Sequence, residues 1–235
     1  MTKVLTVAEM VLRDLARRRT VLGMLFLLPL AFYAARHDQT GQAIRFACLG
    51  LGWGASTAGL FSGNSAKTVE PRLRLVGYSS LALLIGRLAP LLLVSWVIAG
   101  AYFLLIYFDQ DIRRPGALAL LLMLTALVGV PLGMLVGALL PRDLEGTLLL
   151  IGLVGVQMAV DPAKSSSKYL PFWSSREIGT YVVDNVDSGY LSRGLQHGLG
   201  MATGMIVLTG VLTAVRLRRR KHLQSIRQPV AAGVR

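Results

Sequence analysis

The chain has 235 residues, of which 54% are apolar and 16% charged, with a formal net charge of +13 and a mean hydropathy of +0.58. Soluble domains are about 45–50% apolar and about 25% charged, so this composition argues against a soluble enzyme and against a disordered or collagen-like chain. A strongly basic soluble protein suggests a nucleic-acid partner. In an apolar chain the same charge more often records orientation in a membrane, so the position of the charges along the chain decides between the two.

Residues 1–19 predict an amphipathic helix that lies in the membrane interface. At 100° per residue, one face gathers the apolar residues Val4, Leu5, Ala8, Val11, Leu12 and Leu15. The other face is polar, and the helix ends in the basic residues Arg13, Arg17, Arg18 and Arg19. Such a helix turns its basic face toward anionic lipid headgroups. A helix packed on a soluble partner is an alternative, whereas a signal peptide is disfavoured because more apolar segments follow.

Six apolar segments are long enough, or nearly long enough, to cross a membrane as helices. A helix rises about 1.5 Å per residue and the hydrocarbon core is about 30 Å thick, so a span needs about 20 residues. The segments are residues 21–35, 44–62, 88–108, 117–140, 144–160 and 197–215, of which the first and fifth are short. We therefore expect an all-α polytopic membrane protein that forms a single transmembrane domain over residues 1–235.

The charges between these segments alternate as six spans require. With the N-terminus in the cytoplasm, the segments on that side are 1–20, 63–87, 141–146 and the basic tail 216–235. They hold 17 Lys and Arg against 5 Asp and Glu, while the opposite side holds 8 against 7. The positive-inside rule then predicts that both termini lie in the cytoplasm.

The sequence carries no motif of a nucleotide site, a metal centre or a catalytic triad. It lacks the phosphate-binding pattern G-x-x-x-x-G-K-[ST], and its histidines His37, His197 and His222 are too far apart for helix-face metal spacing. No Asp or Glu lies in the middle of a predicted span, which disfavours a proton-driven pump. We therefore predict that the chain is not an enzyme and binds no metal, cofactor or nucleic acid.

Small residues spaced four apart predict close contacts between helices in lipid. The spacing occurs at Gly50/Gly54, Gly129/Gly133/Gly137, Gly194/Gly198 and Gly200/Gly204.

Gln157 is the one amide expected at depth, and an interhelical hydrogen bond is its simpler role. Gln157 and Trp53 are the two residues that we would otherwise place on a substrate path.

Two segments between spans are more than linkers. Residues 65–79 interleave charged and apolar side chains and predict a short interfacial helix, although a basic loop that only fixes topology is the alternative. Residues 161–196 hold apolar clusters around Trp173. Trp and Tyr favour the membrane interface, so short re-entrant helices in the outer leaflet are expected there.

Three stretches of the chain match the layout of a known family. One begins at Glu70 and ends in Gly86-Arg87-Leu88, and a second joins the glycines of 133–137 to the polar stretch 141–145. The third is Leu-Pro-Phe-Trp at 170–173. With its amphipathic N-terminus and six spans, the chain resembles the permease subunit of an ABC-2 type exporter. It departs from the family at Pro71, where a second charged pair is usual, and lacks an Asn-Pro after the outer tryptophan.

The resemblance implies a transport complex. Two permease chains, identical or homologous, pair in the cytoplasmic membrane, and two copies of a separate cytoplasmic ATPase bind ATP and Mg. The implied contacts with the ATPase are Arg13, Arg17, Arg18 and Arg19 in the first helix, and Glu70, Arg72, Arg74, Gly77 and Ser79 in the coupling segment. The cargo would be a hydrophobic or amphipathic compound that is drug-like, lipid-like or a peptide, moved outward.

Two other functions remain open at this point. The first is a membrane assembly or scaffold subunit that transports nothing, which the short spans and small-residue faces fit equally well. The second is a haem-handling permease of cytochrome c maturation, which has a similar size and span count. Such a permease would use outward-facing His or Trp ligands, and here Trp173 is present without a suitable histidine.

Overall fold

The computed structural model describes residues 2–160 and 165–218, and the regular elements in those ranges are all helical. In chain order they are α1 (Thr2–Arg17), α2 (Arg19–Ala34), α3 (Thr40–Leu75), α4 (Ser80–Asp109), α5 (Pro115–Leu139), α6 (Asp143–Ala159), the 3-10 helix η1 (Ser165–Tyr169), α7 (Trp173–Val183) and α8 (Gly189–Arg216). The all-α class expected from the sequence is confirmed for these residues. The tail from residue 219 onward and residues 161–164 lie outside the described residues.

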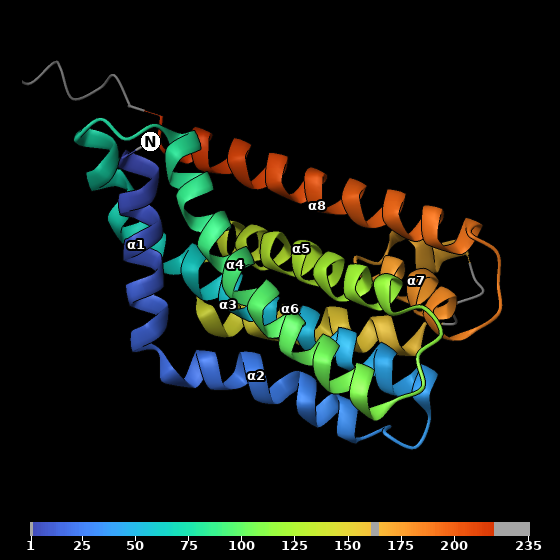
Figure 1. Ribbon diagram of the computed structural model, residues 1–235. Coiled ribbons are helices and arrows are strands. Elements are labelled where there is room, and N and C mark those ends of the chain that lie inside the picture. Colours follow the sequence, from blue (N-terminus) through green and yellow to red (C-terminus); the bar gives the residue numbers. More distant parts are fainter. Residues whose placement is uncertain (1, 161–164, 219–235) are drawn as a thin grey trace, which may run out of the picture.

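Six of the described helices, α2 to α6 and α8, run back and forth between two ends of one bundle (Figure 1). At the first end, called the α1 end, Lys3 of α1 donates to the α3–α4 turn, and Val7 of α1 shares an apolar cluster with Leu217, which follows α8. Lys67 of α3 donates there to the carbonyl of Leu140. At the other end, called the α7 end, Arg114 donates to the carbonyl of Tyr181. The described parts of the segments that the charge pattern assigns to one side of a membrane therefore share one end of the bundle.

Three of the described helices are long and apolar enough to cross a membrane, namely α4, α5 and α8. The apolar α2 has 16 residues and α6 has 17, which makes both shorter than a full span. The long α3 is not apolar enough to count among them, because its buried side consists mostly of Gly and Ala, together with Ser and Thr. The structure thus indicates a membrane protein, and the low hydropathy of α3 reflects its central, buried place in the bundle.

Glycines let α3 approach its neighbours closely. A Cβ on Gly133 of α5 would lie 1.7 Å from the carbonyl oxygen of Ser56, and a Cβ on Gly50 would lie 2.6 Å from the Cα of Pro29. Only hydrogen fits at such approaches. The Gly200/Gly204 pair of α8 differs, since a Cβ at either position would meet no atom within 4 Å. At these two positions, the described chain leaves the surface of α8 uncovered.

Helix α1 lies across the α1 end, at a steep angle to α2 (Figure 1). Its Val7 and Leu15 are buried, and α1 packs against α4. A Cβ on Gly86 would lie 2.7 Å from that of Val7, so the two helices are in close contact. The expected apolar face is divided, because Leu5 is 65% exposed while Leu15 is buried, and Val7, which lies outside that face, also turns inward. The helix is amphipathic, but its most buried side faces the protein.

Residues 65–79 do not form a separate helix. Helix α3 continues through Pro71 to Leu75, and α4 begins at Ser80 after a turn. Gly77 has φ +93° in this turn, a backbone conformation that favours glycine. The Ser79 hydroxyl accepts a hydrogen bond from the Ala82 amide and caps α4. The expected coupling segment is therefore the end of one helix, a tight turn and the cap of the next.

Candidate functional site

A buried cluster of three charged side chains joins α3, α4 and α8 at the α1 end. The Glu70 carboxylate is ion-paired with Arg87 at 2.7 Å and accepts a hydrogen bond from Arg216, the last residue of α8. Glu70 is 2% exposed and Arg87 is 5% exposed. The Arg216 side chain, 31% exposed, closes the cluster toward solvent. One carboxylate thus holds three helices that are far apart in the sequence.

Local sequence explains how each member reaches the cluster. Glu70 lies in the last turns of α3, just before Pro71, which has no amide hydrogen and so removes one backbone hydrogen bond from this part of the helix. Arg87 lies two turns into α4, and its Nε also donates to the Leu83 carbonyl at 3.4 Å. Charges removed from water are costly unless they are paired. The cluster therefore fixes how the ends of these helices pack, because loss of Glu70 leaves Arg87 buried without a counter-charge.

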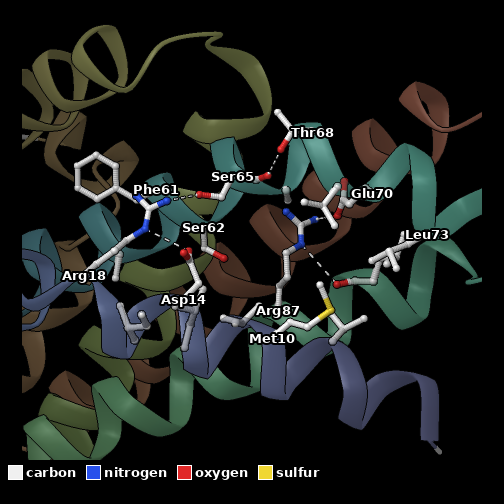
Figure 2. A pocket seen from close by; sticks show the side chains of 18 of the residues that line it. Met10, Asp14, Arg18, Phe61, Ser62, Ser65, Thr68, Glu70, Leu73 and Arg87 are labelled. Carbon is white, nitrogen blue, oxygen red and sulfur yellow. Dashed lines mark hydrogen bonds and ion pairs between the residues drawn. The ribbon is translucent and has the colours of Figure 1, made fainter.

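A cavity of about 460 Å³ lies beside the cluster, between α1, α3 and α4. Figure 2 shows Glu70 and Arg87 on one side of it and Arg18 with Asp14 on the other. Arg18 Nε donates to Asp14 at 3.1 Å, and its Nη2 donates to the Ser65 hydroxyl at 2.8 Å. The remaining walls are mainly apolar. An apolar hollow with a few convergent polar groups is the usual form of a ligand site.

A second polar contact at the α1 end joins α3 to the α5–α6 turn. Asn64 donates to Asp143 at 2.6 Å, and Lys67 donates to both Asn64 and the Leu140 carbonyl. Burial, together with the nearby positive charge of Arg216, lowers the pKa of Lys67 from its ordinary value. The α1 end is therefore crowded with positive charge.

The α3–α4 turn forms an exposed tip next to this cluster. Leu75 is 74% exposed and Val76 is 75% exposed. Lys3 of α1 donates to the carbonyl of Gly77 at 2.9 Å and so ties the tip to the first helix. Large aliphatic side chains with this exposure at the end of a turn are available for contact with a partner.

The residues predicted to contact an ATPase divide into two groups. Several are exposed or half-buried at the α1 end, namely Arg13, Arg17, Arg18, Arg19, Arg72, Arg74, Gly77 and Ser79. Arg74 donates to the Tyr78 carbonyl at 2.9 Å and stiffens the turn. Glu70 lies apart from this group because it is buried. The structure thus brings the predicted residues to one end and gives Glu70 an internal position.

The two predicted path residues do not share a cavity. Gln157 lines a cavity of about 260 Å³ at the α7 end, where its Oε1 is buried without a hydrogen-bond partner. Trp53 is half-buried and packs edge-on against Phe32 at 6.1 Å. The expected interhelical hydrogen bond of Gln157 through this oxygen is absent from the described residues.

Sequence reasoning missed two contacts at the α7 end. Asp109 at the end of α4 accepts a hydrogen bond from Tyr33, and its carboxylate lies 2.8 Å from the Nε2 of His37. The rings of Trp173 and His197 lie edge-to-face with centroids 5.1 Å apart, so a histidine does accompany this tryptophan. Each pair joins residues distant in the chain, and no spacing rule signals them. In the described residues, no three His, Cys, Asp or Glu side chains gather in a metal-binding group.

Comparison with known proteins identifies no relative. No family model matches the chain, and no curated protein sequence matches it. The function must therefore be argued from the sequence and the arrangement described above.

Proposed function

We propose that this chain is the membrane-spanning permease subunit of an ATP-driven ABC-2 type exporter, with six spans across the cytoplasmic membrane and both termini in the cytoplasm. One observation carries the proposal: the described parts of the segments that hold the excess of Lys and Arg, residues 2–20, 63–87, 141–146 and 216–218, meet at a single end of the bundle. Such clustering is what the positive-inside rule requires of a cytoplasmic face. Since the sequence has no phosphate-binding loop, a separate ATPase must supply the energy.

The exposed tip is the proposed docking point for that ATPase. It presents two aliphatic side chains, Leu75 and Val76, close to exposed Arg72. Glu70 lies five residues before Leu75 and links the base of the tip to α4 and α8. Closure of the ATPase on ATP would push the tip, and the cluster would pass the movement to those helices. Transport then follows from a nucleotide-biased equilibrium between two packings of the bundle.

The cargo is proposed to be a hydrophobic or amphipathic compound, and two permease chains to act together. The surfaces of α4 and α8 expose many large apolar side chains, among them Leu93, Val97, Val207 and Val211. These surfaces suit contact with lipid, a second permease chain or an apolar cargo. The direction of transport follows from the family resemblance alone.

The first test is capture of the ATPase. The tagged chain, purified in mild detergent from its host, is expected to carry an ABC ATPase whose gene lies beside its own. The matched variants are Val76→Asp at the tip and Tyr169→Asp at the α7 end, where Tyr169 is 86% exposed. Val76→Asp should release the ATPase and Tyr169→Asp should retain it. Absence of any ATPase from the wild-type preparation would refute the proposal.

The second test separates a transporter from a scaffold. The chain and its ATPase are reconstituted in vesicles with a fluorescent amphipathic dye, and ATP-dependent movement of the dye is measured. Movement that stops in a variant ATPase unable to hydrolyse ATP supports the exporter. A complex that assembles and hydrolyses ATP but moves none of a panel of neutral, cationic and anionic dyes supports the scaffold instead.

A further inference from the structure

The cavity between α1, α3 and α4 has the size and lining of a small-molecule site. Its volume of about 460 Å³ falls within the range of about 300–1,000 Å³ that drug-sized ligands occupy. All three helices contribute apolar walls, which include Val11, Leu15, Phe61, Leu73, Leu83 and Leu91. An apolar body of limited length therefore fits between these helices.

The deep side of the cavity holds a donor and an acceptor that lack hydrogen bonds. Glu70 Oε1 and Arg87 Nη2 are buried without a hydrogen-bond partner, although the two atoms are ion-paired at 2.7 Å. Buried polar atoms without hydrogen bonds are rare in folded proteins. Both residues line the cavity, so a group inside it can reach them.

The charges on the cavity walls are paired. Arg18 is bonded to Asp14, and Arg87 is paired with Glu70. Arg216 approaches Glu70 from α8 and is not part of the lining. A hydroxyl or an amide group is the simplest uncharged group that both donates to the carboxylate and accepts from the guanidinium. We propose that this cavity binds a neutral amphiphile whose hydroxyl or amide group contacts Glu70 and Arg87 while its apolar part lies against α1 and α3.

The proposal goes beyond the proposed function and does not depend on it, because the site belongs to this chain alone. A ligand there touches α1 and both helices that lead to the tip. It would therefore bind whether or not an ATPase is present. The same chemistry is available from the bilayer, as a diacylglycerol, or from the aqueous phase, as a shorter alcohol.

Photolabelling of the purified full chain in phosphatidylcholine nanodiscs tests the site. The probes are a diazirine-bearing decanol added from water, the matched diazirine decane, the matched diazirine decanoate, and a diazirine-bearing diacylglycerol placed in the bilayer. Labelled residues are located by mass spectrometry. We expect saturable labelling by the decanol on cavity-lining residues of α1 and α3, about tenfold weaker for the decane because it lacks the hydrogen-bonding group. Cavity labelling by the diacylglycerol as well would identify the bilayer as a source.

Two variants and one control make the result specific. Ser62→Phe fills the cavity from α3, and Met10→Trp narrows it from α1, so both should abolish saturable labelling. Thr203→Phe adds the same ring on the open face of α8 and should leave the labelling unchanged. Equal labelling by decanol and decane, stronger labelling by decanoate, or saturable labelling that survives in a folded Ser62→Phe or Met10→Trp chain would overturn the proposal.

Discussion

At the scale of single residues, Glu70 is the charged side chain that joins three helices, α3, α4 and α8. It is one carboxylate opposite two guanidinium groups that come from different helices. Glu70 stabilises the fold because it supplies the negative charge for Arg87, which is almost as buried as Glu70 itself. Removing one partner of such a cluster is far more harmful than never having built it.

Glu70→Ala should therefore destabilise the protein by about 3–5 kcal/mol, because it strands a buried guanidinium. The matched control is Glu145→Ala, which removes an ion pair to Arg142 on the exposed start of α6 and should cost less than about 1 kcal/mol. Both values come from reversible unfolding of the purified chain in mixed micelles. A cost for Glu70→Ala no larger than that of the control would show that the cluster does not hold the helices together.

Ser79 offers a second test at the same scale. Its hydroxyl satisfies the Ala82 amide at the start of α4. Ser79→Ala should cost about 1 kcal/mol, as is usual for the loss of a helix N-cap. Ser79→Asp, which keeps a capping oxygen, should restore stability in the same unfolding assay. If Ser79→Ala is neutral, the turn is held by the Arg74 and Lys3 contacts alone.

At the scale of elements, the contact between α3 and α5 rests on glycine. Gly133→Ala places a methyl group against the Ser56 carbonyl and should force the helices apart, at a cost of about 1–3 kcal/mol. Gly200→Ala, in open space on α8, should instead stabilise its helix by up to about 1 kcal/mol. Thermal unfolding of the two variants in detergent compares them directly. Equal effects would mean that α3 and α5 are not in close contact.

At the scale of the whole molecule, the two ends of the bundle should lie on opposite sides of a membrane. Cys48 is buried, so Cys48→Ala provides a background without cysteine for single-cysteine labelling. In intact cells a membrane-impermeant maleimide should modify Tyr169→Cys at the α7 end and spare Val76→Cys at the tip. Opening the cells should expose Val76→Cys. Labelling of both positions in intact cells would rule out the proposed topology.

The sequence predicted the all-α class and the approximate place of the apolar helices, but not the contacts between distant residues. Apolar runs and alternating charge are local properties, so they locate helices and turns. The Glu70–Arg216 contact joins residues 146 apart and has no local signature. The family resemblance implied a partner-facing position for Glu70, because the contact of Arg216 with Glu70 cannot be read from either segment. The low hydropathy of α3 likewise has its cause in burial against other helices.

The order in which the cluster is built has a consequence for synthesis. Arg216 follows Glu70 by 146 residues, which a ribosome adds in roughly ten seconds at about 5–20 residues per second. During that interval Glu70 and Arg87 can already pair, because only one turn separates their helices. The nascent chain therefore holds the Glu70–Arg87 pair before Arg216 is made, and the arrival of α8 completes the cluster.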